Sequence, residues 1–153
     1  MRVAVGVDHR GFEVKDELLA LLVDAGHEVL DLGTDSDASV DYPDYAAAVG
    51  QAIVDGEADR GVVVCGSGVG ACVAANKIVG VRAATCHDTY SAHQGVEHDD
   101  LNLLCLGSSI VGMSLIAEIV TAFLGAEFAD SEERYVRRLH KVQALERGER
   151  LSP

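Results

Sequence analysis

The chain has 153 residues, 48% of them hydrophobic and 24% charged, which is the balance of one globular domain and not of a disordered chain. Its net charge of −13 repels phosphate backbones and argues against general nucleic-acid binding, so a phosphorylated ligand would need a local cluster of cations and N–H groups. No apolar stretch reaches the length of a membrane span or a signal peptide, and the four cysteines form no C-x-x-C pair. We therefore expect no membrane association and a reduced, cytoplasmic location.

Five short, valine-rich runs predict strands buried on both faces, because their apolar residues do not alternate with polar ones. In chain order, the predicted strands cover Val3–Val7, Glu28–Leu32, Gly61–Cys65, Ala83–Cys86 and Leu103–Leu106. Segments with a helical period predict five helices, over Phe12–Ala25, Tyr42–Val54, Val69–Val79, Ser114–Leu124 and Glu132–Arg147.

Strands that alternate with helices favour a parallel sheet covered by helices on both faces. We therefore predict an α/β fold: an open, doubly wound, Rossmann-like sheet of five parallel strands in an αβα sandwich, with a C-terminal helix. Residues 1–148 are expected to form one domain, and residues 149–153 a frayed tail. Ligands of such sheets bind outside the carboxyl ends of the strands, so the residues that follow each strand are the candidates for a site.

The glycine-rich turn C-G-S-G-V-G after the third predicted strand is the most informative of these segments. Gly66, Gly68 and Gly70 let the backbone turn tightly and point several N–H groups into one concavity, where a phosphate or an oxyanion could bind. These N–H groups and the dipole of the next helix also favour a thiolate at Cys65, which could act as a base or a nucleophile. The alternative is a tight strand-to-helix turn with an inert, buried cysteine. The spacing matches neither a Walker A loop nor a dinucleotide-binding fingerprint.

Further candidates are polar residues near other strand ends and on the last helix. Asp8 and His9 follow the first predicted strand, and a carboxylate beside an imidazole can move protons near neutral pH. The alternative for Asp8 is a side-chain cap on the following helix. Arg134 and Arg138 lie four residues apart on one helix face, and could clamp a phosphate or else form a solvated face paired with glutamates. His98, in a predicted loop, is a candidate general acid.

A metal site is the weaker interpretation of the histidines. Cys86, His87, His93 and His98 lie near one another in sequence, but their spacing matches no zinc pattern. We expect neither a metal nor an organic cofactor.

Six motifs together resemble the ribose-5-phosphate isomerase B family of sugar-phosphate isomerases, which includes the galactose-6-phosphate isomerase subunits. They are V-D-H-R-G-F at residues 7–12, D-Y-P-D-Y-A at 41–46, C-G-S-G-V-G at 65–70, A-A-N-K at 74–77, E-H-D-D-L-N at 97–102 and R-Y-V-R-R at 134–138. Each motif is modest alone, but they run in the family's order and spacing over nearly the whole chain. The resemblance implies a cofactor-independent aldose–ketose isomerase, which converts ribose 5-phosphate and ribulose 5-phosphate into each other through a cis-enediolate.

The resemblance also implies a role for each candidate residue. Cys65 would be the base, and Ser67 with the N–H groups of the glycine turn would stabilise the oxyanion. His98 would help to open the sugar ring, and Asp8 would handle hydroxyl protons. Contacts to the sugar or its phosphate are implied for His9, Tyr42, Gly66, Gly68, Gly70, Asp99, Arg134 and Arg138. The family forms homodimers, often paired into tetramers, with sites shared between subunits, so His98 is expected to serve the neighbouring subunit.

Two departures from the family pattern leave the substrate open. Asp99 stands where many members have asparagine, and Ser109 where several have arginine, so an amide donor and a phosphate-binding cation are missing. Arg10, beside His9, could replace that cation. Within the isomerase interpretation, a four-carbon erythrose or erythrulose phosphate and a six-carbon allose or galactose 6-phosphate stay open. Outside it, the alternative is a non-catalytic sugar-phosphate-binding module.

Overall fold

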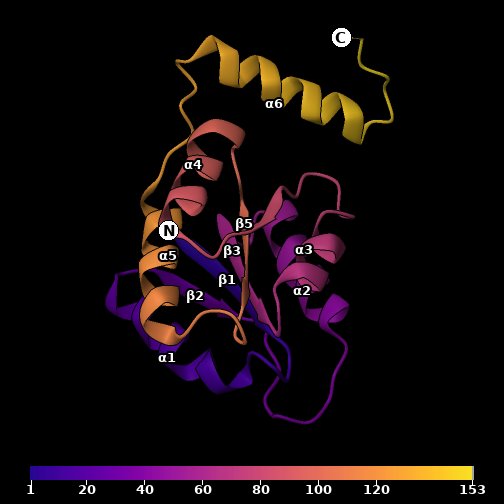
Figure 1. The fold of residues 1–153 in the computed structure, drawn as a ribbon. Helices are drawn as coiled ribbons and strands as arrows, with labels where there is room; N and C mark the ends of the chain where they lie inside the picture. The colour runs from indigo at the N-terminus through magenta and orange to yellow at the C-terminus, as the bar shows by residue number, and fades with distance from the viewer. Residues whose placement is uncertain (153) are drawn as a thin grey trace.

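The five valine-rich segments form one parallel sheet in the computed structural model, which describes residues 1–152 (Figure 1). Its strands are β1 (Arg2–Val7), β2 (Glu28–Asp31), β3 (Arg60–Cys65), β4 (Ala83–Thr85) and β5 (Leu103–Gly107). Their order is β2-β1-β3-β5-β4, and every neighbouring pair is parallel. β5 is buried along its whole length, as its uninterrupted apolar sequence requires. The expected burial on both faces is wrong for β2 and β4, which are only partly buried because each lies at an edge of the sheet with a single neighbouring strand.

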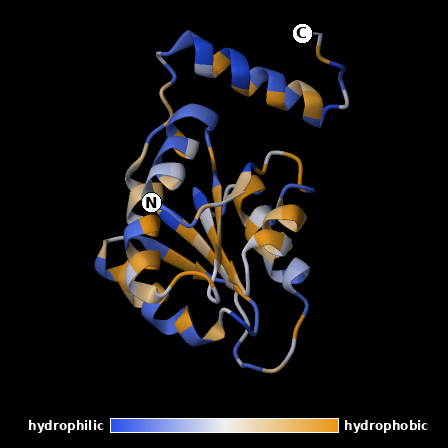
Figure 2. Ribbon diagram, in the orientation of Figure 1, coloured by the Kyte–Doolittle hydropathy of each residue, from blue (hydrophilic) through white to orange (hydrophobic). Residues whose placement is uncertain are grey.

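Helices cover both faces of this sheet. Those on one face are α1 (Phe12–Asp24), α4 (Thr89–Asp99) and α5 (Met113–Gly125), and those on the other are α2 (Tyr42–Val54) and α3 (Val69–Ala75). The last helix, α6 (Glu133–Glu146), lies away from the sheet and packs against α4 (Figure 1). Figure 2 shows mostly apolar strands between the two layers, and a largely polar α6 with apolar patches. The predicted αβα sandwich with a C-terminal helix is confirmed.

The connections that leave β1 and β3 create a crevice at the edge of the sheet where a ligand could bind. The chain leaves β1 toward the α1 face and leaves β3 toward the α3 face, so the carboxyl ends of these neighbouring strands border a topological switch point. The N–H of Asp8 donates to the carbonyl of Val64 at 3.2 Å, which keeps the first residue beyond β1 against β3.

The expectation of a loop at His98 is wrong, because residues 89–99 form α4. This helix is polar overall and buries only Ala92 and Val96, which lie four residues apart, so its apolar period is too sparse to detect in the sequence. Asp88 caps it by accepting a hydrogen bond from the N–H of Ser91 at 2.7 Å. Tertiary packing stabilises α4 more than its own sequence does.

The third helix ends earlier than predicted, at Ala75 instead of Val79. Asn76 explains the early end, because its side chain accepts from the N–H of Ala83 at 3.0 Å and donates to the carbonyl of Ala83 at 2.8 Å. The amide therefore ties the end of α3 to the start of β4. Within residues 1–152, no helix combines the length and the apolar character needed to cross a membrane.

Candidate functional site

Asp8 organises the turn between β1 and α1. Its carboxylate is buried, with 4% of the residue exposed, and its Oδ1 accepts hydrogen bonds from the N–H groups of Arg10 at 2.8 Å and Gly11 at 3.1 Å. The N-cap of α1 is Gly11, and no side chain caps that helix. The alternative that Asp8 caps α1 is therefore wrong, since Asp8 closes the turn before the helix.

His9 forms its hydrogen bond with a different segment of the chain than Asp8 does. Its Nδ1 accepts a hydrogen bond from the N–H of Val40 at 3.3 Å, in the loop between β2 and α2. When the ring is neutral, its remaining proton therefore lies on Nε2. The two neighbours thus follow the same strand but serve separate parts of the crevice.

The glycine turn wraps around the sulfur of Cys65. Cys65 is 5% exposed, and its Sγ accepts a hydrogen bond from the N–H of Gly68 at 3.2 Å. Gly68 has a φ of +79°, and a Cβ at this position would lie 2.9 Å from Cγ2 of Thr85, so only glycine fits. Ser67 is exposed at the tip of the turn, where its Oγ accepts from the N–H of Val69 at 3.3 Å.

Tyr42 lies against the same turn from the side of α2. A Cβ on Gly70 would lie 2.7 Å from Cζ of Tyr42, so the ring rests on the first turn of α3. Tyr42 is 41% exposed, and it can reach a molecule bound at the turn. The structure therefore brings together Asp8, His9, Cys65, Ser67 and Tyr42 at the carboxyl edge of the sheet.

Three further residues hold this edge together; His87 was a candidate only for the weaker metal interpretation, and the other two were not candidates. Ser108 Oγ lies 2.7 Å from the carbonyl oxygen of Arg10 and 3.2 Å from that of Cys65, so it joins the turns after β1, β3 and β5. Thr85 Oγ1 donates to the carbonyl of Gly68 at 3.1 Å, and His87 Nε2 accepts from the N–H of Gly107 at 3.1 Å. Thr85 is the last residue of β4, and His87 and Ser108 follow β4 and β5, so their position at strand ends was the available signal.

The remaining predicted site residues lie elsewhere in the chain. α4 connects the carboxyl end of β4 to the amino end of β5, so its last residues, His98 and Asp99, lie toward the opposite edge of the sheet. The His98 ring stacks on Tyr135 of α6, with ring centroids 4.0 Å apart. One chain therefore holds the predicted residues as two separate groups.

The two predicted arginines belong to the group on α6. Arg134 Nε lies 3.6 Å from a carboxylate oxygen of Glu132, and its guanidinium lies over the Tyr135 ring, 4.7 Å from the centroid. Arg138 is exposed. Arg134 therefore pairs with a glutamate, as the alternative to a phosphate clamp expected, and Arg138 shows no such pair in the part of the chain that the structure describes.

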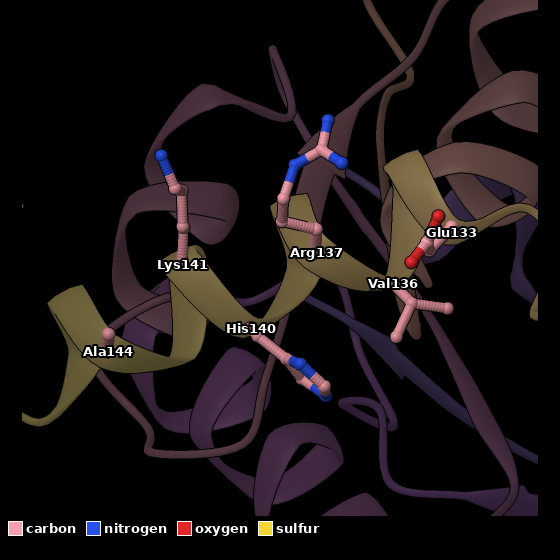
Figure 3. A pocket seen from close by; sticks show the side chains of 6 residues that line it. All are labelled: Glu133, Val136, Arg137, His140, Lys141 and Ala144. Atoms are coloured by element: carbon pink, nitrogen blue, oxygen red, sulfur yellow. The ribbon is translucent and has the colours of Figure 1, made fainter. Parts of the chain in front are cut away.

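An open hollow of about 460 Å³ runs along α6 (Figure 3). Six residues of this helix line it: Glu133, Val136, Arg137, His140, Lys141 and Ala144. Figure 3 shows Arg137 and Lys141 pointing to the same side of the helix, away from His140. The hollow is far from the glycine turn, at the other end of the molecule (Figure 1).

Cys72, on α3, is a second thiol near the site. Its pKa is lowered to about 6, chiefly by a hydrogen bond with Cys105 and also by Thr85 and Asn76, while burial opposes the shift. Burial instead raises the pKa of Cys86 to about 11.

We therefore expect Cys72 to be a thiolate above about pH 6, and Cys86 to remain a thiol through neutral pH. The rate of alkylation by iodoacetamide can be followed for each cysteine-containing peptide with mass spectrometry. At Cys72 the rate should reach half of its maximum near pH 6, and at Cys86 it should be negligible up to pH 9. Equal rates at the two cysteines would contradict the expectation.

A metal site is the weaker interpretation of Cys86, His87, His93 and His98. In the part of the chain that the structure describes, no three histidine, cysteine, aspartate or glutamate residues come together in a way that could hold a metal ion. His93 and His98 each lie 3.8 Å from a carboxylate oxygen of Glu97, on the surface of α4.

Comparison with known proteins covers nearly the whole chain. The family described as Ribose/Galactose Isomerase matches residues 3–142. The chain is 44% identical to ribose-5-phosphate isomerase B of Escherichia coli, over 95% of this chain and 96% of that protein. It is 38% identical to D-erythrulose-4-phosphate isomerase of Pectobacterium atrosepticum, over 84% of this chain and 85% of that protein. The structure of Clostridium thermocellum ribose-5-phosphate isomerase B matches with a TM-score of 0.93 at 42% identity, over 97% of this chain and 99% of that one.

Proposed function

Because this chain belongs to the ribose/galactose isomerase family, we propose that it interconverts ribose 5-phosphate and ribulose 5-phosphate, with Cys65 as the base. The similar proteins of E. coli and C. thermocellum carry the name ribose-5-phosphate isomerase B, which supports this substrate. The observation that carries the mechanism is the position of the Cys65 sulfur, inside the glycine turn and at the switch point of the sheet.

In the proposed reaction, the Cys65 thiolate removes the proton from C2 of the open-chain aldose phosphate. The electron pair moves toward the C1 carbonyl, whose oxygen takes the negative charge of a cis-enediolate. The N–H of Gly68 donates to the sulfur, which holds the sulfur in place at the turn. The proton then passes from sulfur to C1, and the C2 hydroxyl proton moves to O1, which gives the ketose.

The surrounding groups have roles that match their positions. The hydroxyl of Ser67 and the N–H groups of the turn would stabilise the enediolate oxygen, because they are preorganised donors beside the base. Asp8 would carry the hydroxyl proton on Oδ2, since two N–H groups hold Oδ1 in place. Tyr42 would contact the sugar, and His9 its phosphate.

The second group of residues would complete the site of a neighbouring subunit. His98, Asp99, Arg134 and Arg138 lie away from the Cys65 turn of their own chain. Val69 and Val73 on α3, 58% and 57% exposed, form an apolar face that a symmetric homodimer would cover. In such a dimer, His98 would open the sugar ring, and the two arginines would bind the phosphate at the partner's turn.

The test of the proposed function is hydrogen exchange at C2. After treatment with a chelator, the purified chain should interconvert ribose 5-phosphate and ribulose 5-phosphate in deuterated water and place deuterium at C2 of the aldose. NMR measures both the interconversion and the exchange. Saturable binding of the sugar phosphate without exchange would instead make this chain the non-catalytic binding module.

A four-carbon substrate is the second candidate, because the similar protein of P. atrosepticum carries the name D-erythrulose-4-phosphate isomerase. Ser109 lines the hollow beside the turn and adds no cation there, so this edge of the crevice does not select a five-carbon sugar phosphate over a four-carbon one. The ratio of kcat/KM between ribose 5-phosphate and D-erythrulose 4-phosphate decides between the two substrates. Allose 6-phosphate and galactose 6-phosphate complete the panel.

A further inference from the structure

We infer that Arg10 binds the anionic end of the substrate, in a hollow of about 540 Å³ beside the Cys65 turn. This assignment adds a residue to the proposed function and rests on it for the identity of the ligand. The turns after β1 and β5, together with the loop before α2, line the hollow. Its residues are His9, Arg10, Phe12, Glu13, Val14, Asp37, Ser108 and Ser109.

The backbone of Arg10 is fixed on both sides. Its N–H donates to Oδ1 of the buried Asp8 at 2.8 Å, and its carbonyl oxygen accepts from Ser108 Oγ at 2.7 Å. Side chains from two different turns thus hold this one peptide segment. A cation on such a segment loses little conformational entropy when it binds a ligand, because only the side chain remains to be ordered.

The side chain of Arg10 lies over the turn that holds the base. A Cβ on Gly66 would lie 3.7 Å from both Cγ and Nε of Arg10, so the stem of the arginine rests on the residue after Cys65. Within residues 1–152, no carboxylate forms an ion pair with Arg10, whereas Arg2, Arg82 and Arg134 all have such a partner. Arg10 therefore offers an unpaired guanidinium in a protein of net charge −13.

The polar neighbours of Arg10 determine where in the hollow an anion would lie. His9, Ser108 and Ser109 supply an imidazole and two hydroxyls, while the exposed carboxylates of Glu13 and Asp37 repel an anion from their own positions. The guanidinium is a planar fork that matches two phosphate oxygens. A phosphate is thus favoured at the arginine, next to the Cys65 turn, and disfavoured toward α1.

Ser109 provides an independent way to test this location. Its N–H donates to the carbonyl of Gly66 at 3.0 Å, so Ser109 and Arg10 approach the same glycine from two sides. Ser109 is exposed and lines the same hollow, so an arginine there could extend into it without displacing core residues.

The experiment compares Arg10→Gln with Arg150→Gln, a matched loss of one exposed arginine in the C-terminal segment. Loss of a charge-assisted hydrogen bond should raise KM for the sugar phosphate roughly tenfold or more, with kcat changed less than about threefold. The affinity for inorganic phosphate, measured by calorimetry, should fall by a similar factor. Arg150→Gln should change neither value.

Ser109→Arg, introduced into the Arg10→Gln variant, should recover most of the lost phosphate affinity. Arg10→Lys should lie between wild type and Arg10→Gln, because it keeps the charge and loses the fork. Phosphate affinity and KM that match those of Arg150→Gln, or a fall in kcat with KM unchanged, would overturn the assignment. An Arg10-dependent phosphate affinity in a wild-type protein that isomerises none of the four sugars would sustain Arg10 and reject the proposed function.

Discussion

Cys65→Ala is expected to lower kcat by roughly a thousandfold on the best substrate, the middle of the range for a removed general base. The reason is that no other thiol lies within the glycine turn, and alanine cannot take the C2 proton. The substitution removes one buried sulfur atom, so the protein should remain folded, with a nearly unchanged circular dichroism spectrum. Steady-state kinetics on ribose 5-phosphate give the measurement.

Cys72→Ala is the matched control for this prediction. Cys72 has the lowered pKa, near 6, but its sulfur lies 3.4 Å from the carbonyl of Ala83, on the β4 side of α3, and not inside the turn. It should retain most of the wild-type kcat. If the Cys72 variant loses activity and the Cys65 variant keeps it, Cys72 is the base and the proposed assignment is wrong.

A hybrid dimer assembled from two variants that are each inactive is expected to be active. Cys65→Ala removes the base, and Arg134→Ala with Arg138→Ala removes the arginines that would act on the partner's site. Each variant alone should be nearly inactive. A dimer with one chain of each kind contains one intact site of two, so it should show about half of the wild-type kcat per dimer.

Two different affinity tags on co-expressed chains allow the hybrid to be isolated and assayed. A control pair, in which one chain carries all three substitutions and the other is wild type, has one arginine-deficient site and one site without the base. This control should be inactive although half of its chains are intact. Activity in the control pair, or none in the test hybrid, would show that the arginines do not act across the subunit boundary.

The central strands β1, β3 and β5 could be predicted well because each one is a largely buried apolar run, whereas the edge strands β2 and β4 are only partly buried. Burial on both faces of a parallel sheet requires such a sequence, and few other structures do. The predicted and observed bounds of α2 agree at both ends, because Pro43 fits only the first turn of a helix and Val54 is its last apolar position. α4 could not be predicted, because its helical state depends on packing by Ala92 and Val96 and on a cap at Asp88.

The candidate site was predictable only as a set of residues near strand ends. Cys65 and Asp8 are 57 positions apart in the sequence, and they meet because β1 and β3 are neighbours whose connections turn to opposite faces. Tyr42 contacts Gly70, and Arg10 and Ser109 both contact Gly66. These contacts join segments that follow different strands. No local pattern encodes such contacts.

The sequence by itself determined the fold class, the glycine turn with its thiol and the family to which the chain belongs, because these depend on local patterns of residues. Only the tertiary structure decided which of the candidates meet. Asp8, His9, Cys65, Ser67 and Tyr42 lie at one edge of the sheet, while His98 and Arg134 lie with Tyr135 on α4 and α6. The physical reason is that strand order and helix packing, not sequence separation, set the distances between side chains.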